Sequence, residues 1–214
     1  MAVQQIATDR TARFADYIEA RRFDPPRPLL ARAAALAERK AHAFDFGAGA
    51  LNATKYLLSA GFERITALDA APKAQELAQQ LPREHTSFVL SRFEDFAYPA
   101  DCYDLVNAEF CLPFLGRDQF SLVFPRLLGA LRGGGIFTGQ LFGVRDSWNV
   151  ENSGMTFHQR AEAEAYFADF DIVELAEEDH PGTTKLGEPK HWHIFHIIAR
   201  KTPVDDRKGP AISA

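Results

Sequence analysis

The stretch Phe44-Asp45-Phe46-Gly47-Ala48-Gly49-Ala50 decides the fold, because it joins a short apolar strand candidate to a helix through a glycine-rich turn. Glycine at such a turn lets the backbone approach a ligand closely, and the first turn of the following helix leaves N–H groups free for an anion. Twenty residues after Gly49, Asp69 ends the next strand candidate, where a carboxylate can accept hydrogen bonds from both hydroxyls of a ribose. Together these features predict a site for an adenosyl cofactor.

Strand and helix candidates alternate on both sides of this stretch, which is typical of an α/β fold. The pattern predicts a doubly wound, mostly parallel, seven-stranded sheet whose last strand has no helix before it and therefore runs antiparallel. A long loop is expected over residues 177–190, between the last two strands. The strand candidates are 41–46, 64–69, 86–91, 103–110, 136–142, 171–176 and 191–200, and the helix candidates include one that begins at Thr8 or Asp9 and others over 28–40, 117–132 (with a kink or restart at Pro125) and 158–168.

Composition narrows the function classes. The formal net charge of −5 argues against a broad nucleic-acid or anionic-membrane surface, so neither partner is expected. The two cysteines, Cys102 and Cys111, form no zinc motif, and no metal site is expected. Few cysteines, a charged N-terminus without a signal peptide and no long apolar run predict a cytoplasmic protein without a membrane span, either a monomer or a homodimer.

The glycine turn differs from the dinucleotide-binding fingerprint, since Asn52 stands where its third glycine belongs. Residues 44–50 instead resemble the first motif of the class I S-adenosylmethionine-dependent methyltransferases. The order and spacing of further stretches extend the resemblance over about residues 40–200. These stretches are Ala53 to Asp69, Phe93-Glu94-Asp95-Phe96, Tyr103-Asp104-Leu105-Val106 and Leu131-Arg132-Gly133-Gly134-Gly135. Two departures are Leu51, at the position of the motif's third glycine, and Arg92, where many members have an acidic residue.

The resemblance implies S-adenosyl-L-methionine as cofactor and a division into an N-terminal helical cap (1–40), a Rossmann-like methyltransferase domain (41–202) and a flexible tail (203–214). It further implies that Asp69 holds the ribose and that the Gly47–Gly49 loop lines the methionine moiety. Tyr17 and Arg22 are expected to reach the methionine carboxylate. The full set of expected cofactor-binding residues is Tyr17, Arg22, Asp45, Gly47, Ala48, Gly49, Asp69, Ala70, Phe93, Glu94 and Asn107.

The acceptor is expected to be a small molecule, methylated by in-line displacement. Asn107-Ala108-Glu109-Phe110 differs from the Asn-Pro-Pro-Tyr motif of relatives that methylate DNA adenine or glutamine. No catalytic residue is assigned, although Asp179 and His180 are acid–base candidates in the expected loop. Strand alternation separates His196 from His191 and His193, which argues against a three-histidine metal site. Two alternatives remain open: a catalytically silent S-adenosylmethionine-binding partner protein and an NAD-dependent oxidoreductase.

Overall fold

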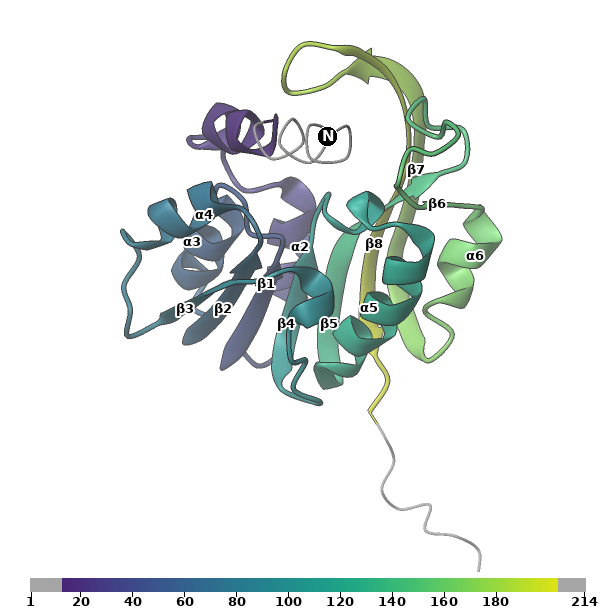
Figure 1. The fold of residues 1–214 in the computed structure, drawn as a ribbon. Helices are drawn as coiled ribbons and strands as arrows, with labels where there is room; N and C mark the ends of the chain where they lie inside the picture. Colours follow the sequence, from purple (N-terminus) through teal and green to yellow (C-terminus); the bar gives the residue numbers. More distant parts are fainter. Residues whose placement is uncertain (1–12, 204–214) are drawn as a thin grey trace, which may run out of the picture.

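The computed structural model describes residues 13–203, which form one twisted sheet with helices on both faces (Figure 1). Seven strands lie side by side in the order β3-β2-β1-β4-β5-β8-β7, and a two-residue strand, β6, pairs with β5. The strands are β1 (His42–Phe46), β2 (Arg64–Asp69), β3 (Thr86–Leu90), β4 (Tyr103–Ala108), β5 (Leu131–Gly143), β6 (Phe157–His158), β7 (Phe170–Thr183) and β8 (Pro189–Lys201).

The pairing confirms the predicted sheet. All neighbours from β3 to β5 are parallel, and β8 is antiparallel to both β5 and β7. The central strands are buried, as expected for parallel strands that are covered on both faces. The doubly wound α/β prediction is therefore correct.

The helices bury two separate apolar layers against the sheet. One face carries α2 (Pro28–Leu36), α3 (Asn52–Ser59) and α4 (Pro72–Ala78), and the other carries α5 (Arg117–Gly129) and α6 (Arg160–Ala165). Proline occupies the first position of α2 and α4, where its missing N–H costs nothing. Helix α5 continues as one helix through Pro125, so the chain does not restart there, and Phe120, Phe124 and Leu127 all pack into the same core.

The strand order reverses between β1 and β4, so their carboxyl ends flank a natural crevice for a ligand. The helix over residues 13–21 lies across this edge of the sheet (Figure 1). The crevice therefore has the glycine turn on its floor and the N-terminal segment above it.

The last two strands form a longer hairpin than predicted, and this corrects the expected loop over residues 177–190. Pairing continues to Thr183 and Pro189, so only residues 184–188 connect the strands. In the charged run Glu177–His180, apolar and polar residues do not alternate, so the sequence pattern does not predict a strand there. Because β7 is an edge strand, it tolerates Pro181.

The end of this hairpin curls over the crevice toward the N-terminal helix (Figure 1). Two ion pairs join the hairpin end to the N-terminal segment: Arg13 of the helix with Glu188, and Asp24 Oδ1 after the helix with Lys185 Nζ at 2.9 Å. We call the helix over 13–21, residues 22–27 and the hairpin end the roof.

Within the described residues, no helix is both long enough and apolar enough to cross a bilayer. The expected helix start at Thr8 or Asp9 and all of the expected tail (203–214) except its first residue lie outside the described residues. The fifth strand begins earlier than predicted, at Leu131, because its first residues already pair with β4.

Candidate functional site

The glycine turn folds tightly against the end of β2. The N–H groups of Gly47 and Ala48 both donate to the carbonyl of Leu68, at 2.9 and 3.0 Å. Gly47 and Gly49 have φ angles of 77° and 48°, in the left-handed region that glycine adopts without penalty. The turn thus presents backbone rather than side chains to the crevice.

Leu51 also has a left-handed backbone, with φ at 62°, although it is not glycine. Its side chain is fully buried and packs in a small core with Ile18, Ala48 and Ala74. The burial of a leucine side chain is worth about 1.5–3 kcal/mol, which offsets a left-handed cost of about 1–2 kcal/mol. Leu51, which stands in place of the family's third glycine, therefore packs the turn against Ile18 of the roof helix.

Asp69 braces this turn. Its Oδ2 accepts a hydrogen bond from the N–H of Gly49 at 2.8 Å, and its Oδ1 accepts one from Ala71 at 2.8 Å. Burial raises the pKa of this carboxyl, and the backbone hydrogen bonds oppose that rise. Asp69 lies where the sequence predicts it, at the carboxyl end of β2, and it still has lone pairs for a hydroxyl ligand.

Asp45 lies beneath the turn and is completely buried. It accepts hydrogen bonds from Thr54 Oγ1 at 2.6 Å and from Asn107 Nδ2 at 2.9 Å. Burial raises the pKa of the Asp45 carboxyl. These contacts fix α3 and β4 to β1, and they leave the Oδ1 of Asn107 without a hydrogen-bond partner among the described residues.

A small cavity of about 80 Å³ brings six of the predicted site residues together. Pockets that bury a drug-sized ligand measure about 300–1,000 Å³, so a nucleoside-sized ligand requires the roof to move outward. The predicted residues that line it are Tyr17, Asp45, Gly47, Ala48, Gly49 and Asn107, and they are joined by Arg21, Pro25, Pro26, Arg27, Ala50, Asn52, Ala53 and Glu109.

Four other predicted residues lie beside this cavity rather than in its lining. Asp69 and Ala70 end β2, and Phe93 and Glu94 begin the short 3-10 helix that follows β3. The ring of Phe93 stacks on Phe46 with centroids 3.9 Å apart. The side chain of Arg92, the second departure from the family's motifs, forms an ion pair with Glu94.

Arg22, which is expected at the methionine carboxylate, does not line this cavity. Arg22 pairs with Glu19 at 3.5 Å and lies over the exposed ring of Phe23, while Arg21 lines the cavity. One residue along a helix turns a side chain by about 100°, so a sequence pattern without the tertiary contacts does not separate neighbours.

Arg27 and Glu109 are cavity residues that sequence reasoning missed. The Arg27 guanidinium lies 4.0 Å from the centroid of the Phe110 ring and donates to the hydroxyl of Tyr17 at 3.4 Å. Burial lowers the pKa of Arg27. The signal for Arg27 was its place in the proline-rich segment that crosses the crevice, and the signal for Glu109 was its position directly after β4.

The acid–base candidates of the hairpin do not reach this cavity. Asp179 pairs with Arg145 and, at 2.7 Å, with His191. His180 is exposed and contacts Glu178 at 3.5 Å. Asp179 and His180 lie on paired β-strand rather than in a loop, so the network that holds Asp179 is an exposed one on the edge strand.

The three histidines of β8 each have a separate acidic partner. His191 faces Asp179 and His193 faces Glu177, whereas His196 faces Glu178 from the other side of the strand. Within residues 13–203, no three His, Cys, Asp or Glu side chains come together as a metal site.

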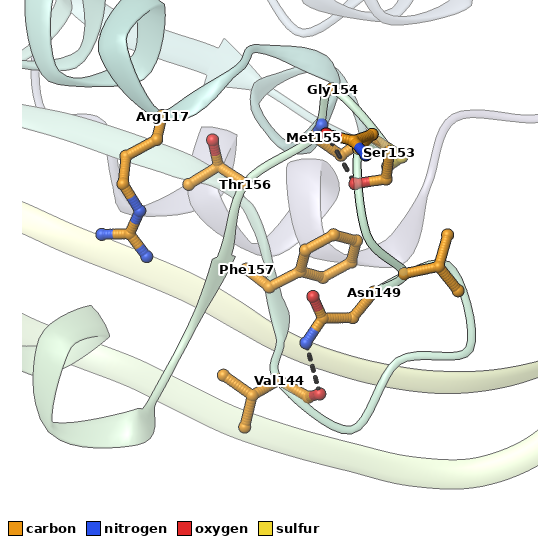
Figure 2. Close-up of a pocket in the computed structure, with 10 residues that line it drawn as sticks. Arg117, Val144, Asn149, Ser153, Gly154, Met155, Thr156 and Phe157 are labelled. Carbon is orange, nitrogen blue, oxygen red and sulfur yellow. Dashed lines mark hydrogen bonds between the residues drawn. The ribbon is translucent and has the colours of Figure 1, made fainter.

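A second cavity, of about 360 Å³, lies between the start of α5 and the loop that follows β5 (Figure 2). Arg117 of α5, Phe157 of β6 and the loop around Asn149 all contribute to its lining. Asn149 Nδ2 donates to the carbonyl of Val144 at 2.8 Å and so shapes the loop. This cavity shares no lining residue with the first.

Comparison with known proteins gives one family match and many similar structures. Residues 44–138 match the model of a methyltransferase domain. Among solved structures, a Burkholderia thailandensis 1,6-didemethyltoxoflavin-N1-methyltransferase, with 1,6-didemethyltoxoflavin and S-adenosylhomocysteine bound, is 22% identical with a TM-score of 0.62; the alignment covers 93% of this chain and 90% of that one.

The N-methyltransferase NodS from Bradyrhizobium japonicum WM9, in complex with S-adenosylhomocysteine, is 18% identical with a TM-score of 0.59. That alignment covers 86% of this chain and 98% of that one. No curated protein matches the sequence significantly.

Proposed function

The chain carries an S-adenosylmethionine-dependent methyltransferase domain of the class I fold, and from that premise we propose that its acceptor is a small molecule held under the roof. The observation that carries the proposal is the covered crevice: the proline-rich segment lines one cavity with the glycine turn, and the hairpin end is paired to the same N-terminal segment. Such a roof suits a compact acceptor that fits beneath it. The similar structures named above include enzymes that methylate the nitrogen of small molecules.

The residues of the crevice fit the cofactor. The turn from Gly47 to Gly49 exposes backbone, Asp69 offers carboxylate oxygens, and Arg21 with Arg27 supplies positive charge for a carboxylate. Asn107 has a buried oxygen without a partner among the described residues, and such an atom is stabilised when a ligand donates to it. Asp69 would hold the ribose, and the turn, the two arginines and Asn107 would hold the amino-acid part.

The bound cofactor supplies a methyl group on a sulfonium, which is already activated for displacement. The protein has therefore to align the acceptor and exclude water. Phe110 supplies an apolar wall beside Arg27, and its ring contacts Phe142 and Trp192 with centroids 6.2 and 6.4 Å apart. Beside this wall, the cavity lining includes several polar side chains, among them those of Arg27, Asn107 and Glu109.

The size of the acceptor can be tested without knowing its identity. The purified protein is incubated with methyl-labelled S-adenosylmethionine and a bacterial extract, which is then divided by ultrafiltration. Once chromatography has separated unreacted S-adenosylmethionine from the low-mass fraction, we expect a new labelled compound there, and much less of it with the Asp69→Ala variant. Label confined to protein or nucleic acid would overturn the proposal.

Asp69→Ala is expected to weaken the binding of S-adenosylhomocysteine by about 10- to 100-fold, the equivalent of one hydrogen bond to a charged group. The variant also leaves the N–H groups of Gly49 and Ala71 without their acceptor, so some loss of stability accompanies it. Calorimetric titration measures the affinity. The exposed carboxylate variant Glu76→Ala is the control, and equal affinity in both variants would remove Asp69 from the site.

A further inference from the structure

Glu109 occupies a distinctive place in the crevice. It directly follows β4, two residues after Asn107, and it lines the same cavity as Asp45 and the glycine turn. Its Oε1 is buried and has no hydrogen-bond partner among residues 13–203. A buried carboxylate oxygen without a partner is costly, which indicates that a group from a ligand completes its hydrogen bonding.

The surroundings of Glu109 tune its charge. Arg27 and Arg21 face it from the roof, and Asp45 faces it from β1. On the sheet, Gln140 lies beside it and reaches His196 Nδ1 with its amide nitrogen at 3.4 Å, while its amide oxygen accepts from the N–H of Phe110 at 3.0 Å. Burial raises the pKa of Glu109 to about 7, against the opposing effect of Arg27.

We propose that Glu109 is the proton acceptor of the methyl transfer, and that the acceptor molecule is a neutral compound which presents an N–H or O–H group to it. The inference rests on the proposed function. As the bond from carbon to the acceptor nitrogen or oxygen forms, the carbon–sulfur bond breaks and its electron pair stays on sulfur. The acceptor's proton moves to the free Oε1 of Glu109.

Three contacts favour this role over a structural one. Gln140 is fixed by Phe110 and His196, so it holds the carboxylate from one side and leaves the other oxygen open. The Arg27 guanidinium contacts the Phe110 ring and the Tyr17 hydroxyl, and among the described residues it forms no ion pair with Glu109. A general base works best when its pKa lies near the working pH, which this environment provides.

The test compares two ligands that differ at the point of transfer. S-adenosylhomocysteine is neutral there, whereas sinefungin carries a protonated amine in place of the methyl sulfonium. Calorimetry measures both affinities from pH 5.5 to 8.5 for the wild type, for Glu109→Gln and for the exposed control Glu76→Gln. The ratio of the two affinities cancels any general effect on folding or on the adenosyl site.

In the wild type and in Glu76→Gln, the preference for sinefungin is expected to rise by on the order of tenfold across this range, as Glu109 loses its proton. In Glu109→Gln the ratio is expected to stay flat, with S-adenosylhomocysteine bound nearly as in the wild type. A flat ratio in the wild type would overturn the role of Glu109 while leaving the proposed function intact. Failure of the wild type to bind S-adenosylhomocysteine would overturn the proposed function itself.

Discussion

Lys190→Met is expected to lower the free energy of unfolding by about 3–5 kcal/mol, because it leaves the carboxylate of Asp146 buried without its cation. Both side chains of this ion pair are fully buried. The Lys190 ammonium also lies 3.9 Å from the ring centroid of Trp148 and 4.5 Å from that of Trp192. Urea denaturation, with the slope unchanged from the wild type, measures the loss.

A second substitution separates the charge from the packing. In the double variant Asp146→Asn, Lys190→Met no buried charge remains, and the asparagine oxygen still accepts from the N–H of Trp148, a bond of 2.9 Å in the wild type. Most of the lost stability should return. The matched control is Lys185→Met at the exposed hairpin end, where surface substitutions change stability by within about 0.5 kcal/mol. A Lys190→Met variant as stable as that control would contradict the argument.

Gly47→Ala is expected to destabilise the protein by about 2–5 kcal/mol and to weaken cofactor binding along with it. A left-handed backbone costs about 1–2 kcal/mol for a residue with a Cβ, and overpacking adds about 1–3 kcal/mol. An added Cβ would lie 2.4 Å from the Cβ of Cys111, which has no room to withdraw because its thiol donates to the carbonyl of Phe46 at 3.0 Å.

Gly61→Ala is the matched control for that prediction. Gly61 has a φ of 91°, but no atom lies within 4 Å of its added Cβ, so it carries the backbone cost without the collision. Thermal unfolding of the two variants, with and without S-adenosylhomocysteine, compares them directly. If both lose the same stability, the collision with Cys111 contributes nothing.

The sequence predicted the central sheet because each parallel strand is a short apolar run that a glycine or proline signal bounds. The turn at Gly47 and the strand end at Asp69 are local features of the chain, so their placement at one edge followed from the strand order. The antiparallel last strand followed from the missing helix before it. These elements depend on contacts that sequence periodicity describes directly.

The rest depends on contacts between distant segments. Lys190 falls within the segment expected to be a loop, and nothing local marks it as buried; its partner Asp146 and two tryptophans surround it only in the folded chain. The strand that contains Glu177 is charged and has no strand-like sequence pattern; it forms because it pairs with the apolar β8. Arg27 meets Glu109 in the crevice because the roof crosses it, a contact that no spacing in the sequence records.

The left-handed Leu51 has a consequence for how the molecule opens. Its side chain shares a small core with Ile18 of the roof helix, and neither contacts the large core on the opposite face of the sheet. Segments that share a core open together as one cooperative unit, and their local stability can be well below that of the whole molecule. The roof helix and the glycine turn should therefore gain or lose order together. A ligand that orders the turn would at the same time raise the hydrogen-exchange protection of a helix that begins before the first strand of the sheet.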